Sequence, residues 1–490
     1  MSAAPVGGQS LLDEEVEITR RRERLHHRVL ETSRGLQARF GAPGRTRTGV
    51  QAQLSVSPDG TAATAAVGPT SGLQAVGDTA TLRIPDINAS NACGKYFSVR
   101  TRVVYSGQRS IILEDVTAPL AGRMDATYRS IGDEFEGVMW PVLTANFGNP
   151  LAMDARLDRN GKIIMLFSPV VNNNFSGIAG FVIGCDFYPR TQAQSSNEGE
   201  VFYATVATSM FGGVASIQSP DGWRRSMRST IIHEAKHITA YAERMARGHG
   251  LEDGWLEEAT ARHSEELYAR ALAKGAWKNN TGHSAIACDV RPSLSACADQ
   301  PYVMYKHFSG LPEYMAANGT LTPLGQTSTN DYNYYASGWS LVRWAADLAP
   351  AEAAFFQALT RGPASGVTNL ESVTGRPWAE MVADWTMSLA LDDYPGFLPA
   401  RDQRVATWNL PDVFAGMHKD FPASYVRPHP LAAYVASFGG FAVQGSALRG
   451  GSASMVDLTG AWSGPQVLEL RLPGGGVPSS TLRLAVTRIR

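Results

Sequence analysis

The stretch from residue 226 to residue 275 constrains the fold most, because it reads as two helices joined by a glycine-rich turn. Gly248, Gly250 and Gly254 interrupt the helical pattern between the two halves. At such a break the chain is able to turn back, so that the second helix presents its side chains to the first. The sequence therefore predicts a helical hairpin in the middle of the chain.

The first of these helices contains the motif HEAKH, from His233 to His237. Residues four apart lie on one face of a helix, so both imidazoles reach a single metal ion. Glu234 then projects beside the open coordination position, where a general base accepts a proton from water. Ser229 and Thr230 are plausible capping residues for the start of this helix. The motif predicts a zinc site; the alternative is two histidines beside a solvated glutamate.

A catalytic zinc ion typically has three protein ligands, so a third ligand is expected downstream. The second helix begins GWLEEATA and offers two adjacent carboxylates, Glu257 and Glu258. The spacing between the two helices does not by itself decide which of these two carboxylates is the third ligand.

This pair of helices resembles the gluzincin metallopeptidases, whose second helix carries a WLNEG-type motif with the glutamate as ligand. Aligning Trp255 and Leu256 with that motif implies that Glu258 is the third ligand, with Glu257 where the family usually has asparagine. The intervening loop is slightly longer than in the aminopeptidase-N-like branch, which keeps Glu257 as the alternative.

The resemblance also implies a supporting carboxylate at Glu265, two turns after Glu258. Such a residue hydrogen-bonds a ligand imidazole and fixes its tautomer. The alternative for Glu265 and its neighbour Glu266 is a solvated helix face. His249 and His263 are interpreted as loop and surface residues rather than as ligands.

The segment YYASGWSLVRW, which begins at Tyr334, contains a Tyr-x-x-Gly element. The aminopeptidase-N-like enzymes use the tyrosine of such an element to donate to the oxyanion that develops during peptide hydrolysis. By this resemblance Tyr335 is the candidate donor, with Tyr334 second. The alternative is an aromatic cluster in the core.

The wider arrangement, from about residue 120 to residue 400, resembles the hyicolysin family of secreted neutral metallopeptidases. No GAMEN-like segment for gripping a free amino terminus is present, which favours an endopeptidase over an aminopeptidase. The resemblance also implies secretion. It rests on the two motifs above together with LDRNGKIIMLFS, YYASGWSLVRWAADL and ESVTGRPWAEMVADWTMSLALDD.

The expected fold class is α+β, with a mainly helical gluzincin-type catalytic region, a β-rich N-terminal part and a C-terminal β-sandwich-like domain. Alternating runs around residues 81–116 and short runs between glycine-rich turns beyond residue 402 indicate the two β-rich parts. The predicted regions are an amphipathic helix and leader segment (1–45), a β-rich region (46–120), a metallopeptidase domain (121–401) and an all-β domain (402–490).

Two local patterns are interpreted conservatively. His26 and His27 lie in the charged N-terminal helix, where a solvated face is favoured over a metal site. Asp154, Asp158 and Asn160 lack the spacing and the distal glutamate of a calcium loop, so a plain turn is favoured there.

The charges of the chain are balanced, which excludes a strong overall electrostatic field around the protein. Its 44 lysine and arginine residues face 45 aspartate and glutamate residues, which gives no general attraction for nucleic acid or an anionic membrane. No apolar run is long enough for a membrane span. The expected partner is a protein or peptide substrate, and no pattern specifies an oligomeric state.

The four cysteines favour export. Cys288 and Cys297 bracket a short segment that a disulfide is able to close, and Cys93 and Cys185 would then form the second pair. Four cysteines allow three pairings, and four reduced thiols are the alternative. The first residues do not form a signal peptide, so the sequence corresponds either to a cytoplasmic protein or, as we prefer, to a mature secreted form.

Together these features predict a secreted zinc metalloendopeptidase with His233, His237 and Glu258 as metal ligands. Glu234 is the expected general base and Tyr335 the expected oxyanion donor. Two alternatives stay open: a catalytically silent zinc-containing binding or surface protein, and a zinc hydrolase of a non-peptide bond.

Overall fold

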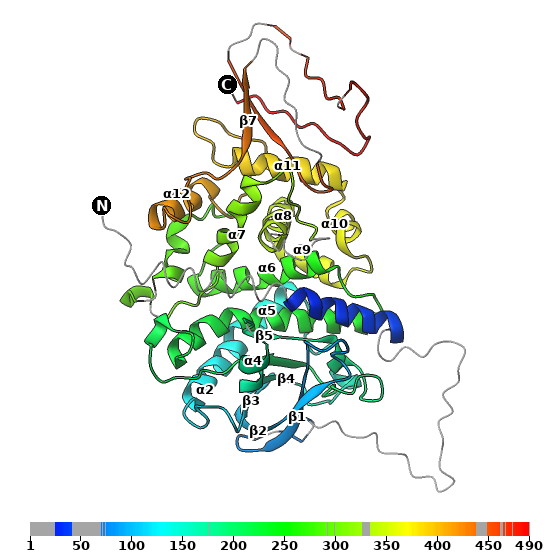
Figure 1. Cartoon of the computed structure of the whole chain (residues 1–490), viewed down its shortest axis with the longest axis vertical. Coiled ribbons are helices and arrows are strands. Elements are labelled where there is room, and N and C mark those ends of the chain that lie inside the picture. Colours follow the sequence, from blue (N-terminus) through cyan, green and yellow to red (C-terminus); the bar gives the residue numbers. More distant parts are fainter. Residues whose placement is uncertain are drawn as a thin grey trace, which may run out of the picture.

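The computed structural model shows an α+β protein built in layers (Figure 1). A six-stranded sheet lies at one end, two long helices cross the middle, and further helices cover the opposite side of that pair. The described residues are 25–41, 70–325, 334–437 and 448–489, without 71, 74, 176, 292, 298, 461–463, 466 and 473.

The sheet has the strand order β1-β2-β3-β4-β6-β5. Its middle strands β3, β4 and β6 are parallel, and all their residues are buried, as expected for strands covered on both faces. The outer strands pair antiparallel, which leaves the short β5 at one edge. The strands are β1 (Thr79–Pro85), β2 (Tyr96–Ser106), β3 (Ser110–Asp115), β4 (Ile163–Phe167), β5 (Gly180–Phe181) and β6 (Val201–Ala204).

The β-rich region predicted around residues 81–116 is confirmed by β1, β2 and β3. Most of the preceding stretch, which the sequence analysis also assigns to this region, lies outside the described residues. The plain turn predicted at residues 154–160 is also present, and β4 follows it.

The predicted helical hairpin is confirmed as α5 (Pro220–Ala246) and α6 (Gly254–Ala273). The first helix begins nine residues before the predicted caps: the Ser219 hydroxyl accepts a hydrogen bond from the amide of Gly222, and Pro220 occupies the first turn. Ser229 and Thr230 therefore lie inside the helix. Both helices are buried along most of their length, because α5 packs on β5 and β6, and α6 packs on α8.

The remaining helices lie on both sides of the hairpin (Figure 1). Between β3 and β4, α2 and α3 are joined by a π-helical turn, η1. These helices are α2 (Asp125–Glu134), η1 (Phe135–Met139), α3 (Trp140–Asn146), α4 (Pro169–Asn174), α7 (Tyr305–Ala316), α8 (Tyr334–Leu348), α9 (Glu352–Arg361), α10 (Gly366–Thr374) and α11 (Trp378–Leu391).

The stretch predicted as a C-terminal all-β domain begins differently. Its first element is a helix, α12 (Leu410–Asp420), which packs on a short 3-10 turn at His283–Ala285. The described residues that follow contain two short, mostly exposed parallel strands, β7 (Ala433–Ser437) and β8 (Met455–Thr459). A β-sandwich is not seen in the described residues. Alternating polarity alone does not require strands to pack face to face.

Two disulfides join Cys93 to Cys185 and Cys288 to Cys297. These are the pairs that the sequence favours among the three possible. The first ties the segment between β1 and β2 to the segment after β5.

A helix over residues 25–40 forms the N-terminal end of the described chain and lies alongside α5 (dark blue in Figure 1). Its presence agrees with the predicted amphipathic helix; the earlier residues of that prediction lie outside the described part. Leu25, Val29 and Leu30 are buried, so one face of this helix belongs to the core.

Candidate metal centre

Helix α5 places the two histidines of the HEAKH motif on one buried face. The ring centroids of His233 and His237 lie 4.9 Å apart, and both residues are almost fully buried. Glu234, between them, is equally buried. A helix presents residues four apart side by side, so the sequence alone determines this part of the geometry.

Helix α6 brings Glu258 against the same two imidazoles. Its carboxylate oxygens lie 3.2 Å from Nε2 of His233 and 3.6 Å from Nε2 of His237. Glu258 is completely buried and projects from the first turns of α6, where the glycine-rich turn has returned the chain to α5. The hairpin therefore joins three donor groups from two helices.

The atoms that converge here lack ordinary partners. Nε2 of His233, Nε2 of His237 and both carboxylate oxygens of Glu258 form no hydrogen bond with any residue that the structure describes. Leaving buried polar atoms unsatisfied is costly, so such a cluster indicates a missing binding partner. Two neutral imidazoles and one carboxylate are the donor set that a zinc ion takes in catalytic sites.

The opposite ring nitrogens of the two histidines are held by carboxylates of α6. Nδ1 of His233 lies 2.7 Å from Glu265, and Nδ1 of His237 lies 2.8 Å from Glu257. When each Nδ1 donates its proton to a carboxylate, each Nε2 keeps a lone pair directed at the cluster. Both imidazoles are thereby oriented as metal ligands require.

The structure thus places the two rival carboxylates differently. Glu258 faces Nε2 of both histidines, whereas Glu257 lies behind His237. Glu257 also forms an ion pair of 2.9 Å with Lys236, the charged residue inside the HEAKH motif. Adjacent residues of a helix point in different directions, which explains why one carboxylate enters the cluster while the other supports it.

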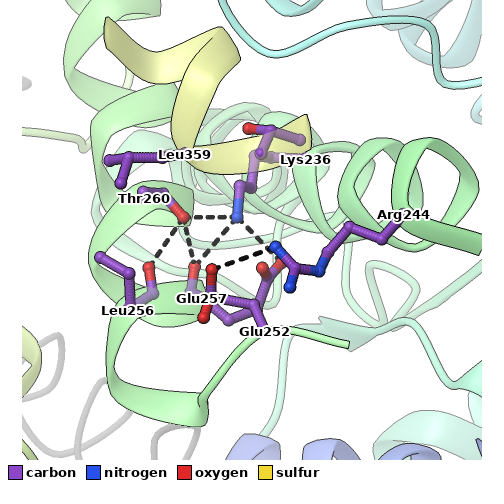
Figure 2. Close-up of a pocket in the computed structure, with 8 residues that line it drawn as sticks. Lys236, Arg244, Glu252, Leu256, Glu257, Thr260 and Leu359 are labelled. Atoms are coloured by element: carbon purple, nitrogen blue, oxygen red, sulfur yellow. Dashed lines mark hydrogen bonds and ion pairs between the residues drawn. The ribbon is translucent and has the colours of Figure 1, made fainter. Parts of the chain in front are cut away.

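Figure 2 shows the polar layer on the Lys236 side of the hairpin. The Lys236 ammonium donates to Glu257 and to the Thr260 hydroxyl, and the Arg244 guanidinium pairs with Glu252 nearby. Leu359 contributes to the wall of the small pocket between these groups. The layer is buried and closed, so it supports the cluster from behind rather than admitting a ligand.

Glu265 and Glu266 are fully buried, which excludes the solvated helix face considered as their alternative. Glu265 forms an ion pair of 2.7 Å with Lys306, besides its contact with His233. His263, interpreted from the sequence as a surface residue, is also buried and lies 3.0 Å from Glu266. That interpretation was wrong because α8 covers the face of α6 that carries His263.

Electrostatics favour an ionised Glu258 and a neutral His233 in this cluster. Burial opposes ionisation of Glu258, but the neighbouring imidazoles of His237, His233 and His26 outweigh it and hold its pKa well below the usual range. Burial lowers the pKa of His233, against the raising effect of Glu258 and Glu265. A deprotonated carboxylate and an uncharged imidazole are the forms that bind a metal ion.

His26 is the largest departure from the sequence interpretation. It is buried, not solvated, and its ring lies in the cluster: Nδ1 is 3.5 Å from Glu258 and Nε2 is 3.0 Å from Glu234. His26, His233, His237 and Glu258 each offer one ligand atom within 4.8 Å of the others. The only sequence signal is the apolar face of its helix, formed by Leu25, Val29 and Leu30, since His26 lies on that face.

Tyr335 lies near the start of α8, on the side that faces α6. Its ring stacks against the guanidinium of Arg262 at 5.6 Å from the ring centroid, and its neighbour Tyr334 lies 4.5 Å away, centroid to centroid. Both tyrosines are buried. Arg262 is one helical turn beyond Glu258, so Tyr335 packs close to the hairpin that carries the cluster.

Comparison with known proteins supports a metalloprotease origin for part of the chain. No known protein-family profile matches it. Over 149 residues the chain is 29% identical to the neutral metalloprotease ShpI of Staphylococcus hyicus, which covers 29% of this chain and 31% of that protein. The chain thus spans about a third of the length of this relative. Among the described residues, no helix is both long and apolar enough to cross a bilayer. The chain is therefore a distant, partial relative of a metalloprotease and carries a buried histidine and glutamate cluster that suits a metal ion.

Proposed function

We propose that this chain is a secreted zinc metalloendopeptidase that hydrolyses peptide bonds in protein substrates. The observation that carries the proposal is the convergence of His233, His237 and Glu258, with unpartnered donor atoms, beside the carboxylate of Glu234. The likeness to a neutral metalloprotease supports the same reaction class. The two disulfides and the resemblance to the hyicolysin family support export.

In this proposal His233, His237 and Glu258 hold zinc, and Glu257 and Glu265 keep the two imidazoles in the ligating tautomer. When bound, zinc acts as a Lewis acid that lowers the pKa of water and polarises the substrate carbonyl. The protein supplies the geometry: two helices, fixed to each other by buried ion pairs, present three donors at one point.

Glu234 performs the proton transfers. Its carboxylate is buried beside the cluster, on the same helix as His233 and His237. As a carboxylate it accepts the proton of the attacking water and then delivers that proton to the nitrogen of the leaving amine. Tyr335 is proposed to donate a hydrogen bond to the oxyanion formed between these two steps.

The first test is the substitution Glu234→Gln, which removes the base but keeps the shape of the side chain. Zinc content per chain and casein hydrolysis are measured for the wild type, for Glu234→Gln and for Glu243→Gln. Glu243 lies on the same helix but pairs with Arg247 and Arg361, so it is a matched control. We expect all three to hold about one zinc. Hydrolysis should be lost only in Glu234→Gln, and full activity in that variant would refute the general-base role.

A second candidate function is a catalytically silent protein with a structural zinc site. The observation that favours it is His26, which adds a fourth protein donor and would close the coordination sphere. Structural zinc sites are closed, whereas catalytic sites keep one position open. Which candidate is correct depends on whether the helix that carries His26 is a permanent part of the site.

A further inference from the structure

We propose that the N-terminal helix (residues 25–40) is an internal inhibitor, and that its residue His26 occupies the fourth coordination position of the metal. This inference rests on the proposed function, because it concerns regulation of the same site. It explains why a cluster suited to catalysis is covered by a histidine from a distant part of the chain.

The geometry of His26 blocks two catalytic groups at once. Its Nε2 forms a hydrogen bond of 3.2 Å with the carbonyl oxygen of Gly180 and lies 3.0 Å from a carboxylate oxygen of Glu234. With the proton on Nε2, the lone pair of Nδ1 is on the side of Glu258, 3.5 Å away, and so faces the ligand atoms of the cluster. A single imidazole thus takes the place of water at the metal and engages the carboxylate that must accept the proton of that water.

The helix is attached by specific contacts to the surroundings of the cluster. The Ser33 hydroxyl accepts a hydrogen bond of 2.9 Å from the amide of Gly184. The Gln37 amide donates to the carbonyl of His249 and accepts from the amide of Leu251, at 3.0 and 2.6 Å. These contacts anchor the helix to the segment after β5 and to the turn between α5 and α6.

An ion pair and apolar contacts complete the attachment. Arg34 lies 2.7 Å from Asp253, the residue that precedes α6, and the Leu30 side chain packs near Gly254. Burial of these apolar side chains stabilises the docked helix. The face of the helix that carries His26 is also the face that is buried, so docking and occupation of the site occur together.

A peptide substrate needs both the open coordination position and the free carboxylate of Glu234. While the helix is docked, His26 blocks both the coordination position and the carboxylate. Hydrolysis then requires a minor state in which the helix has moved away, and activity is reduced by the fraction of molecules in that state. Replacing His26 weakens the docked state at its point of contact with the metal.

The test compares wild type, His26→Ala and His27→Ala in the full chain. His27 is the adjacent, half-buried residue, and it serves as a matched control for changes in helix propensity. Two properties are measured: casein hydrolysis of the zinc protein, and the visible absorption spectrum after replacement of zinc by cobalt(II). The spectrum reports the ligand set of the metal independently of catalysis.

We expect His26→Ala to hydrolyse casein on the order of tenfold faster than wild type, with a changed cobalt spectrum, and His27→Ala to match wild type. A changed spectrum without hydrolysis in any protein would establish His26 as a ligand and refute the peptidase function instead. Equal hydrolysis and identical spectra in wild type and His26→Ala would overturn the inhibitor proposal. Failure of all three proteins to bind cobalt or zinc would overturn both proposals.

A different observation carries a second inference, near the N-terminal ends of β4 and β6. Asp154, Asp158 and Glu200 offer carboxylate oxygens within 4.8 Å of one another. Glu200 is fully buried, and neither of its carboxylate oxygens has a hydrogen-bond partner among the described residues. From this we infer that the three carboxylates bind a hard divalent cation, with calcium the best match.

The surroundings suit such an ion. Asp158 accepts hydrogen bonds from Thr70 and from the side chain of Asn160, and Asp154 accepts one of 2.9 Å from the amide of Gly161. These contacts orient the two aspartates in the turn before β4, while Glu200 immediately precedes β6. Oxygen ligands from carboxylates are what calcium prefers, and an ion would satisfy the buried oxygens of Glu200.

The turn predicted from the sequence at residues 154–160 is present, and the sequence there lacks the pattern of a single contiguous calcium loop. The third carboxylate comes from a separate segment that the parallel pairing of β4 with β6 brings alongside. A search for a contiguous motif therefore misses it.

Isothermal titration of calcium chloride into the EGTA-treated, zinc-resupplied protein tests this second inference. Wild type should bind about one calcium ion, and Glu200→Gln should bind at least about tenfold more weakly. Asp289→Asn is the matched control, because Asp289 is also buried but accepts backbone hydrogen bonds from Val303 and Tyr305. No binding heat in wild type, or unchanged binding in Glu200→Gln, would overturn the inference.

Discussion

The carboxylate of Glu257 lies 2.8 Å from Nδ1 of His237, on the side of the ring opposite to the cluster. Its neighbour Glu258 instead faces Nε2 of both motif histidines. Because the two glutamates are adjacent on a helix, their side chains point in different directions. Glu258 lies inside the cluster, and Glu257 lies behind it. The first prediction separates these tasks.

Glu258→Gln should weaken zinc binding far more than Glu257→Gln. Removal of Glu258 takes away the only proposed carboxylate ligand, whereas loss of a supporting carboxylate typically costs about 10–100-fold in metal affinity. Competition with a zinc chelator measures both affinities. If Glu257→Gln proved the more damaging, Glu257 would be the ligand.

Lys236→Met should destabilise the metal-free protein by about 3–5 kcal/mol, because it leaves the buried carboxylate of Glu257 without its cationic partner. The double variant Lys236→Met with Glu257→Gln should recover part of this loss, since no unpaired charge remains. Urea unfolding of the wild type, the two single variants and the double variant gives a double-mutant cycle, which measures the interaction energy between the two residues. Additive losses would show that the 2.9 Å contact is energetically unimportant.

Tyr335→Phe should lower kcat by about 10²–10³-fold, as the loss of one oxyanion donor does elsewhere, without changing zinc content. Tyr334→Phe is the matched control from the adjacent position of α8. The two variants are compared in a background with His26→Ala, so that the inhibitor helix does not mask the effect. If kcat fell only in Tyr334→Phe, Tyr334 and not Tyr335 would be the oxyanion donor.

The free energy of unfolding should fall as pH rises from about 4 to about 7, because of the Asp186 carboxyl. Burial raises the pKa of Asp186 to about 7, against the opposing hydrogen bonds from Asn197 and Tyr203. The folded protein then holds a proton that the unfolded chain, with its ordinary carboxyl, has already released. The free energy of unfolding therefore decreases through this window, by up to about 1.4 kcal/mol per pH unit for this one group.

Asp186→Asn removes this contribution, so the stability difference between variant and wild type should shift in favour of the variant as pH rises. Urea unfolding at about pH 5 and about pH 8 gives the two differences. Equal differences at both pH values would contradict the assignment of a raised pKa to Asp186.

The sequence by itself determined the features that depend on neighbouring residues. The helical hairpin, the shared face of His233 and His237, the strands β1 to β3 and the preferred cysteine pairs all follow from periodicity, spacing and turn residues. Helical geometry fixes the relative directions of residues that are close in sequence, so these features required no knowledge of the rest of the fold.

Only the tertiary structure decided which surfaces meet. His26 resembles a solvated residue in its charged helix, and His263 a surface residue, until docking buries them against α5 and α8. Glu200 joins Asp154 and Asp158 only because β4 and β6 pair. Periodicity shows that a helix has a face to bury, but which partner covers that face depends on the packing of segments distant in sequence.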